Sequence, residues 1–520
     1  MLSDLTRRLR LTLPSLQDGS LPSRFWLLAR DWYGLLLSAL LALATALHYV
    51  MAPEGQTPIF DDAYISLTFA DNLAHHAKLS YDGVTWSTGA TSPLHVSLLA
   101  AMIKAGIEPV FAGLALGVVF QSVLGASCYM LGWAVFRSRL TALLSGAAIA
   151  FIPYAPLDAG NGLETSLFLS VVTLAVASFL LTASLRGRAL TGGLIALAVF
   201  TRPEGALLIP ALLICRWLWR DRDEKLVDMA KEAVLIAAPG VTAAGLVALY
   251  SLVVGDTLGG TASAKMQFFQ EYQWRLVDKV TFAEQRIAVF AAPMVTLIAF
   301  GAVVANRREM LLFGLFLAPL LVLHAYYFPG GMEHYFFRYQ HPALPFIAVM
   351  AAGGATYLIL KAATSELAVK ALVLLAFVVA LVPLSQQYQR WRVIYRDASN
   401  EVHALLVGMA KDLNTIIEPN ETVATHDIGA VGFFGDYEVL DLVGLINPKV
   451  VPYHKDRRLA QYVDGARPDY LLMFPQWDFD FLHIYPGDYP KKYQLVRVYP
   501  GGVARVEPYL LYKIDWSQEE

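Results

Sequence analysis

The chain has 520 residues, of which 56% are hydrophobic and only 16% are charged. Soluble domains carry roughly 25% charged residues, so this composition excludes an ordinary soluble protein and indicates a membrane protein. The net charge of −3 lacks the excess of basic residues typical of nucleic-acid-binding proteins, and we expect no nucleic-acid partner. The two cysteines, Cys128 and Cys215, lie in apolar runs, which argues against a disulfide framework and a cysteine-based metal site.

The beginning of the chain predicts a membrane helix that is retained. Residues Met1 to Arg30 are basic and contain only short apolar stretches, unlike a cleavable signal peptide. The first run with the ~20 residues that a membrane span needs is Trp32–Met51. Because basic residues flank spans on the cytoplasmic side, we expect the N-terminus in the cytoplasm.

Apolar runs without formal charge recur along the chain and predict about eleven membrane-spanning helices. These runs are Trp32–Met51, Val110–Phe136, Thr141–Leu157, Thr165–Ser184, Leu190–Phe200, Ala206–Cys215, Ala233–Val254, Ile287–Ala305, Leu311–Leu323, Pro342–Leu360 and Ala371–Gln389. The fifth and sixth runs are short enough for these spans to be tilted or interrupted.

The distribution of basic residues supports one orientation. With the N-terminus inside, the cytoplasmic loops contain Arg137 and Arg139, Arg186 and Arg188, Arg216–Lys225, Arg307 and Arg308, and Lys361. This agreement with the positive-inside rule requires that Pro93–Ala105 does not cross the membrane. The first external loop, residues 52–108, is therefore predicted to hold two interfacial helices, one after Asp61 and one over Pro93–Ala105.

The same orientation places several polar segments outside the membrane with Asp61. They are Asp158–Glu164, Arg202–Glu204, Gly255–Gln285 and Phe328–His341. Residues 1–389 are then a membrane module, and residues 390–520, richer in charge, Tyr, Pro and Gly, are a periplasmic α/β domain. In that domain we predict a helix at Ser399–Leu413 and strands at Glu421–Ala424, Glu438–Val443 and Tyr470–Phe474.

Asp61 and Asp62 are the strongest candidates for chemistry. Two adjacent carboxylates raise each other's pKa, so the pair is unfavourable unless it has a role. It could act as a general base or bind a divalent cation such as Mg or Mn. The alternative is that one of the two aspartates caps the following helix, and both roles are compatible.

A second set of charged residues lies at or near the membrane surface. Arg202 and Glu204 interrupt an apolar stretch, and ionisable residues at membrane depth indicate function. Arg202 could bind a lipid phosphate, with Glu204 orienting it. Glu164 stands at a helix start, where the helix dipole alone could explain it.

Three further segments carry candidate ligand-binding residues. Lys265, in a loop rich in glycine and hydroxyl groups, could bind a phosphate, although a flexible loop explains the same composition. Arg338 and Tyr339 precede a span and fit a phosphate anchor, or side chains that reach back to the interface. Trp86 suits sugar stacking and the interfacial aromatic belt equally well. His334 and His341, seven residues apart, would share roughly one face of a continuous helix. A metal site is conceivable there, but no tight pair such as His-x-x-x-His supports it.

Several short motifs resemble those of the GT-C superfamily of membrane glycosyltransferases. The similarity is to the mycobacterial terminal arabinofuranosyltransferase group and related bacterial proteins. It is carried by Asp61–Ile65, Thr91–Leu94, Gly162–Thr165, Arg202–Gly205, Thr261–Lys265, His426–Gly429 and Asp441–Leu445. Gly259 and Gly260 stand where relatives commonly have Pro-Asn, which leaves the donor and acceptor open.

The resemblance implies an inverting transferase of the inner (plasma) membrane. Its donor would be a polyprenyl-phosphate sugar, such as an arabinofuranose donor, and its acceptor an envelope glycan or glycolipid. Asp61 would be the base, with Asp62 assisting or binding metal, and Arg202, Lys265, Arg338 and Tyr339 would hold the donor phosphate. Substrate contacts would come from Tyr64, Trp86, Glu164, Glu204, Thr261 and His334. His426-Asp427 is interpreted as structural or as an acceptor contact.

Two other functional classes compete with this interpretation. A transporter or flippase of a lipid-linked sugar would favour inverted repeats and broken helices near the bilayer midplane. A non-catalytic protein of envelope-polymer assembly would use its C-terminal domain to recruit partners. The sequence shows no repeat, and its polar segments gather on one predicted face, which favours the transferase.

Overall fold

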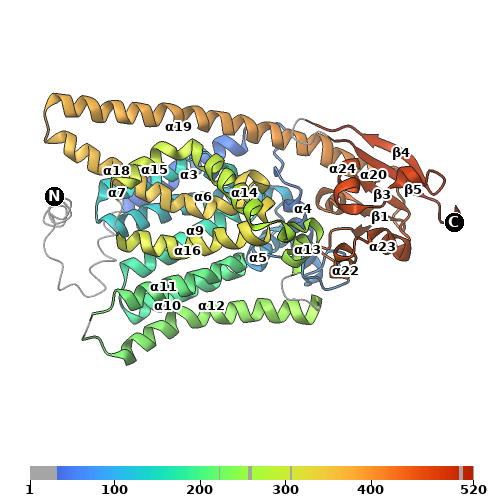
Figure 1. Cartoon of the computed structure of the whole chain (residues 1–520), viewed down its shortest axis with the longest axis horizontal. Coiled ribbons are helices and arrows are strands. Elements are labelled where there is room, and N and C mark those ends of the chain that lie inside the picture. Colours follow the sequence, from blue (N-terminus) through green and yellow to red (C-terminus); the bar gives the residue numbers. More distant parts are fainter. Residues whose placement is uncertain (1–31, 222, 256–259, 305–306, 503–506, 519–520) are drawn as a thin grey trace.

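A computed structural model describes residues 32–518, except residues 222, 256–259, 305–306 and 503–506. The basic segment Met1–Arg30, and with it the predicted retained start, lies outside the described residues, as does Gly259. What is described consists of an elongated helical bundle with a small domain at one end (Figure 1).

Within the described residues, each of the eleven apolar runs is largely helical, and most of these helices run along the long axis of the molecule (Figure 1). They are α3 (Trp32–Val50), α6 (Pro109–Phe136), α7 (Arg139–Phe151), α9 (Thr165–Leu181), α10 (Leu185–Thr201), α11 (Leu208–Leu218), α12 (Leu226–Gly255), α14 (Leu276–Ala291) with α15 (Val295–Ala302), α16 (Arg307–Tyr327), α18 (Leu344–Ala363) and α19 (Leu367–Glu401).

Within the described residues, seven helical segments are long and apolar enough to cross a membrane. They contain α3, α6, α12, α14 with α15, α16, α18 and α19. The other four helices, α7, α9, α10 and α11, have 13, 17, 17 and 11 residues. The count of eleven spans therefore stays a prediction.

Small residues bring the bundle helices into close contact. A Cβ atom on Gly125 of α6 would lie 2.5 Å from the carbonyl oxygen of Ser38 in α3. A Cβ atom on Gly354 of α18 would lie 1.8 Å from the carbonyl oxygen of Phe300 in α15. Backbone contacts of this kind are typical of helices that pack inside membranes.

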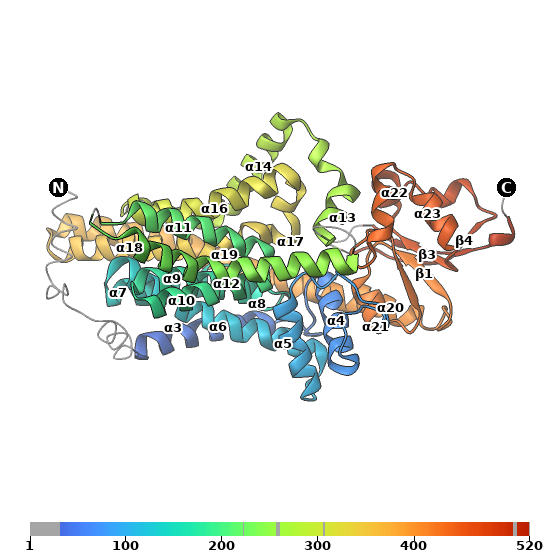
Figure 2. The same cartoon turned by 90° about the horizontal axis from the view of Figure 1, so that it is seen from below.

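Short elements connect the bundle to the small domain. The first loop contains α4 (Asp62–His76) and α5 (Pro93–Lys104), as predicted, and α5 is too short to cross a membrane. Together with α13 (Gly260–Phe269) they lie between the bundle and the small domain (Figure 2). The remaining short helices of this part are α8 (Tyr154–Ala159), η1 (Pro203–Leu207), η2 (Glu271–Gln273), η3 (Ala292–Met294), η4 (Pro329–Met332), α17 (His334–Phe337) and η5 (Arg338–Ala343).

The small domain is built on a five-stranded sheet with the order β2-β1-β3-β5-β4. β1 (Thr422–Thr425) is parallel to β2 (Glu438–Asp441) and to β3 (Tyr470–Met473), which confirms the three predicted strands. β5 (Tyr509–Ile514) is antiparallel to β3 and to β4 (Tyr493–Tyr499). The helices around the sheet are α20 (Gly408–Leu413), α21 (Gly429–Phe434), η7 (Pro448–Val450), α22 (Val451–Lys455), α23 (Leu459–Ala466), α24 (Pro475–Trp477), η8 (Asp478–Leu482), η9 (Pro486–Asp488) and η10 (Trp516–Gln518).

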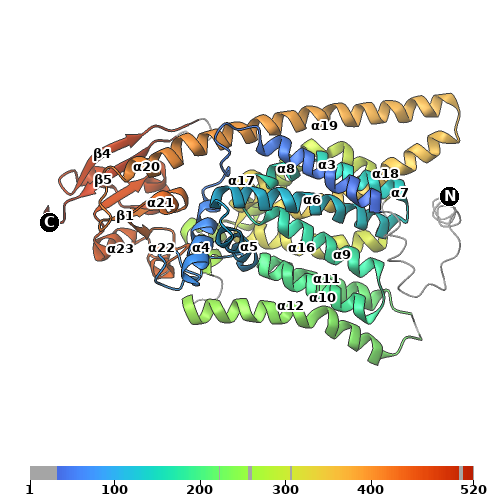
Figure 3. The same ribbon diagram turned by 180° about the vertical axis from the view of Figure 1, so that it is seen from behind.

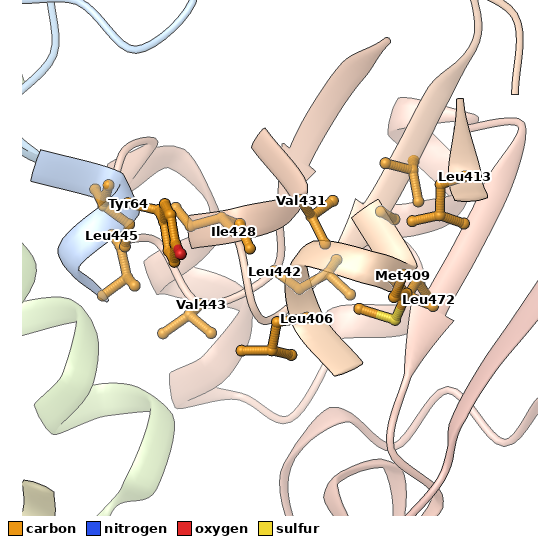
Figure 4. Close-up of a cluster of buried hydrophobic side chains, with 14 of the residues drawn as sticks. Tyr64, Leu406, Met409, Leu413, Ile428, Val431, Leu442, Val443, Leu445 and Leu472 are labelled. Carbon is orange, nitrogen blue, oxygen red and sulfur yellow. The ribbon is translucent and has the colours of Figure 1, made fainter. Parts of the chain in front are cut away.

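One hydrophobic core joins the small domain to the first loop. Tyr64 of α4 lies in the same buried cluster as Ile428, Leu442 and Leu445 (Figure 4). The two parts therefore pack against each other through a continuous apolar interior.

Helix α19 continues from the bundle to the small domain, as Figures 1 and 3 show. Its 35 residues lead directly into the π-helical turn η6 (Val402–Val407) and α20. The predicted domain boundary at residue 389 falls inside this helix.

Candidate active site

Asp61 and Asp62 lie at the start of α4 and are bound by different parts of the molecule. Asp61 is buried, and its Oδ2 and Oδ1 atoms accept hydrogen bonds from the backbone N–H groups of Gly429 (2.8 Å) and Ala430 (2.9 Å). Asp61 holds the N-cap position of α4, but its side chain makes no capping bond there. The Oδ2 atom of Asp62 lies 3.3 Å from Nζ of Lys265 in α13.

The surroundings of Asp62 keep its carboxylate ionised. Partial burial raises the pKa of Asp62, but the charges of Lys265 and Arg338 and a hydrogen bond from Tyr335 bring the pKa below its usual value. Burial likewise lowers the pKa of Lys265, and the charge of Asp62 more than offsets this, so the Lys265 pKa is raised. At neutral pH both groups are therefore charged.

A second ionic cluster is centred on the buried carboxylate of Glu164. Its Oε1 atom accepts a hydrogen bond from Nη2 of Arg338 at 2.8 Å, and Nη1 of Arg202 is 3.7 Å from the same oxygen. Burial raises the pKa of Glu164, but Arg338 and Arg202 lower it overall. Because the charge of Arg338 also acts on Asp62, this residue links the two clusters.

Arg202 is held at the end of α10 by several groups. Its Nη2 atom donates to Oε1 of Glu204 at 3.0 Å, and its guanidinium lies 5.1 Å from the ring centroid of Tyr339. The short helix η1 interrupts the chain between α10 and α11 at this point, so both charges sit at a helix break, as predicted. Aromatic rings and carboxylates together orient a guanidinium that would be costly to bury alone.

Three nitrogen atoms of side chains that act on Asp62 or Glu164 have no hydrogen-bond partner among the described residues. They are Nε of Arg338, Nε2 of His334 and Nδ1 of His95, and all three atoms are buried. His334 and Arg338 act electrostatically on Asp62, and His95 acts on Glu164. Buried polar atoms are almost always bonded, so unsatisfied nitrogens grouped around two carboxylates indicate a place for a polar ligand.

The loop that carries His334 and Arg338 has an unusual backbone. Tyr335, Phe336 and Phe337 have φ values of 50°, 57° and 68°, a conformation that side chains disfavour. The ring of Tyr335 stacks on Phe60, with centroids 4.0 Å apart. Because of this break, His334 and His341 do not lie on one continuous helix. His341 pairs with Asp158 at 2.7 Å.

The remaining predicted substrate residues lie in different environments. Tyr64 is fully buried, and its ring packs against Phe433 and Phe434 of the small domain. Trp86 is half exposed and meets the ring of Tyr250 edge-on. Thr261 is half-buried in the first turn of α13, the helix that carries Lys265.

The two carboxylates of Asp61 and Asp62 are bound by different protein groups. Each oxygen of Asp61 already accepts a backbone hydrogen bond, and Lys265 pairs with Asp62. Among the described residues, no three or more His, Cys, Asp or Glu side chains are grouped so that they could hold a metal ion. The divalent cation at this pair stays a prediction.

Two motifs of the small domain have local structural roles. The carboxylate of Asp441 accepts hydrogen bonds from the backbone N–H groups of Val443, Gly444 and Ile446, which shapes the loop after β2. Nε2 of His426 accepts a hydrogen bond from the backbone N–H of Phe474 at 3.2 Å. Oδ2 of Asp427 accepts a hydrogen bond from the hydroxyl of Tyr509 at 2.5 Å.

His95 and Asp158 belong to the site in the structure but are not among the site residues predicted from the sequence. His95 is buried in α5, and its Nε2 atom lies 3.3 Å from the carbonyl oxygen of Gly162, next to Glu164. A histidine inside an apolar interfacial helix was the only signal for it. Asp158 could not be recognised from nearby residues, because its partner His341 is 183 residues away in the sequence.

Comparisons with known proteins identify the fold. Residues 384–512 match the model of a domain of unknown function, DUF8728. No curated protein sequence matches the chain.

Several solved structures share the architecture of nearly the whole chain. ArnT from Cupriavidus metallidurans, bound to undecaprenyl phosphate, is 14% identical, with a TM-score of 0.53 over 92% of this chain and 98% of ArnT. The oligosaccharyltransferase AglB from Archaeoglobus fulgidus, in complex with an inhibitory peptide and a dolichol-phosphate, is 12% identical, with a TM-score of 0.54 over 94% of this chain and 75% of AglB. The chain has the fold of these proteins, which is the GT-C fold predicted from the sequence.

Proposed function

We propose that the protein is an inverting glycosyltransferase that moves a sugar from a polyprenyl-phosphate donor to a hydroxyl group of an envelope glycan or glycolipid. The observation that carries the proposal is the pair of linked clusters, Asp62 with Lys265 and Glu164 with Arg338 and Arg202. They lie at the end of an apolar bundle whose fold is that of proteins solved with undecaprenyl phosphate and dolichol-phosphate. A pentofuranose such as arabinofuranose is the sugar that the sequence resemblance favours.

Asp62 is the proposed base, rather than Asp61. Both oxygens of Asp61 are bonded to the small domain, whereas Asp62 is partly exposed and lies among cationic side chains. A sugar hydroxyl has a high pKa, so the Asp62 carboxylate takes its proton as the hydroxyl oxygen attacks the anomeric carbon. The bond from that carbon to the phosphate oxygen breaks, and one displacement inverts the configuration.

The cationic side chains have the chemistry to bind the donor phosphate. Polyprenyl phosphate leaves with the electron pair of the broken bond, and Arg338, Arg202 and Lys265 can stabilise its negative charge. The unsatisfied Nε atom of Arg338 supplies a donor that the Glu164 interaction does not use. Tyr339 supports Arg202, and His334, Trp86, Glu204 and Thr261 are proposed to contact the sugars. Tyr64 is proposed to pack the small domain in place, since its ring is fully buried.

The proposed location is the external face of a bacterial inner membrane, with the N-terminus inside. This orientation rests on the basic residues of the predicted cytoplasmic loops. It puts the small domain and the carboxylates in the compartment where envelope glycans are assembled.

Sugar transfer by the full-length protein in lipid nanodiscs tests this function. Polyprenyl-phosphate sugars, including the arabinofuranose donor, are incubated with envelope glycan acceptors, and the products are analysed by mass spectrometry. We expect Asp62→Asn to lower the turnover number by about 1,000-fold, as for loss of a general base. An Asp62→Asn variant with full activity would remove Asp62 as the base, and movement of the lipid-linked sugar across the bilayer without any product would favour a transporter.

A further inference from the structure

The carboxylate of Asp61 joins two parts of the chain that are far apart in sequence. It accepts both backbone hydrogen bonds at the start of α21 across a separation of 368 and 369 residues. The side chain is 3% exposed, so these bonds are shielded from water. A buried carboxylate whose two oxygens each accept a backbone hydrogen bond is held in one orientation.

The partner segment fits Asp61 because residue 429 is a glycine. A Cβ atom at this position would lie 2.0 Å from the carbonyl oxygen of Asp61 and 2.5 Å from its carboxylate carbon. Any larger side chain would therefore force α21 away from the start of α4. The motif Ile428-Gly429-Ala430 is thus shaped to receive Asp61.

Further contacts align the same two segments. The hydroxyl of Tyr81 donates a short hydrogen bond to the carbonyl oxygen of Ile428. Tyr64, which belongs to the shared core drawn in Figure 4, packs against Phe433 and Phe434 at the other end of α21. The contacts of Tyr81 and Tyr64 hold the small domain on α4. Of the three residues that join these segments, Asp61 is the one that directly precedes the proposed base, Asp62.

The position of Asp61 connects this contact to the chemistry. Asp61 and Asp62 are consecutive at the start of α4, so the backbone that carries one carboxylate also carries the other. The Asp62 carboxylate must stay near Lys265, at 3.3 Å in the structure, to face the cationic cluster. Misplacing a catalytic group by about 1 Å can cost 100-fold in rate.

We propose that Asp61 is a positioning residue, which binds the start of α21 and thereby fixes the Asp62 carboxylate beside Lys265. The inference rests on the proposed function in that Asp62 is the base. It gives Gly429, the last residue of the His426–Gly429 motif, a role as a binding partner of Asp61. It also explains why two adjacent carboxylates are present, because each has a separate partner.

Two measurements on the full-length protein in nanodiscs test the proposal. Hydrogen exchange reports the protection of the Gly429 and Ala430 amides without any substrate. Steady-state kinetics with the polyprenyl-phosphate sugar gives the turnover number, the KM and the pH profile. The variants are Asp61→Asn, Asp62→Asn and Tyr81→Phe, the last of which removes a hydrogen bond between the same segments and leaves Asp61 intact.

We expect the amides of Gly429 and Ala430 to be protected in the wild-type protein. In Asp61→Asn, one acceptor oxygen becomes an NH₂ donor that faces a backbone N–H, so exchange should rise at least about tenfold. Turnover should fall by about 10- to 100-fold at nearly constant KM, with the acid limb of the pH profile retained. Asp62→Asn should lose turnover with unchanged exchange, and Tyr81→Phe should keep turnover within about threefold.

The proposal would be overturned by unprotected Gly429 and Ala430 amides in an active enzyme. It would also fail if Asp61→Asn lost the acid limb of the pH profile, because Asp61 would then be the base. Equal losses of turnover in Asp61→Asn and Tyr81→Phe would assign Asp61 to general attachment of the domain. Absence of any sugar transfer by the wild-type protein would refute the proposed function, while the exchange data would still report the Asp61 contact.

Discussion

The two ends of helix α10 carry buried arginines in contrasting environments. Near its start, Arg188 donates to Oε2 of Glu232 and to the carbonyl oxygen of Phe179. Arg216 donates to both oxygens of the same Glu232 and pairs with Glu224, so each oxygen of Glu232 accepts at least one hydrogen bond from an arginine.

At the other end, Arg202 and Arg338 share Glu164, and Nε of Arg338 has no hydrogen-bond partner among the described residues. The comparison separates two uses of buried charge. A saturated network fastens helices to one another, whereas an unsaturated one keeps binding capacity for a ligand.

The largest effect among tests of this comparison is expected at Arg338. Arg338→Gln removes the charge shared by Glu164 and Asp62, together with the unsatisfied Nε donor. Hydrogen bonds to charged groups contribute about 1.5–3 kcal/mol, so the KM for the polyprenyl-phosphate donor should rise by about 10- to 100-fold. Initial-rate kinetics in nanodiscs measures this, with Arg338→Lys as the matched control, and an unchanged KM would exclude a phosphate contact.

At the start of α10, a substitution in the network of Arg188, Arg216 and Glu232 should change the stability of the protein rather than its activity. Glu232→Gln removes the charge that joins α10, α11 and α12 and should lower the free energy of unfolding by about 1–3 kcal/mol. Thermal unfolding in nanodiscs measures the loss. The turnover number of the folded variant should match that of the wild type, and a selective loss of turnover would contradict the contrast between the two ends.

The pH profile should sharpen the assignment of Asp62. Because its pKa lies below the usual value, the carboxylate stays ionised across the neutral range, and activity should fall only as the pH drops through that lowered pKa. Among the charges that lower the pKa of Asp62, that of Lys265 has the largest effect. Lys265→Met removes this charge, so the acid limb of the pH profile should move to higher pH. Rates measured from acid to neutral pH test this shift. An acid limb that does not move would show that Lys265 does not set the pKa of the base.

The smallest effect is expected on removal of divalent cations. Lys265 already supplies a positive charge at Asp62, and both oxygens of Asp61 are occupied by backbone donors. Treatment with EDTA should therefore leave the transfer rate within about twofold. Loss of activity that Mg²⁺ or Mn²⁺ restores would instead support the predicted cation at the aspartate pair.

Local patterns in the sequence predict much of the fold. The break at Arg202–Gly205 is visible because charged residues interrupt two apolar runs, and η1 lies there. β1, β2 and β3 are predicted by short apolar or β-branched runs. The sequence prediction leaves out β4, although its residues Tyr493–Tyr499 contain Tyr, Leu and Val in a strand-like run.

Long-range partners are not encoded locally. Asp61 and Gly429 are 368 residues apart, and nothing near either residue identifies the other. The two carboxylates therefore look equivalent in the sequence, and only the tertiary structure distinguishes them.

The continuity of α19 has a consequence for what counts as a separable unit of this protein. The segment that matches the domain of unknown function begins at residue 384, in the middle of this helix and next to Pro383. Within that segment, the backbone oxygen of Tyr388 accepts a hydrogen bond from Tyr49 of α3, and the Tyr395 ring is fully buried. The matching unit thus includes part of the bundle wall, and cutting the chain at its boundary would divide a helix rather than a linker.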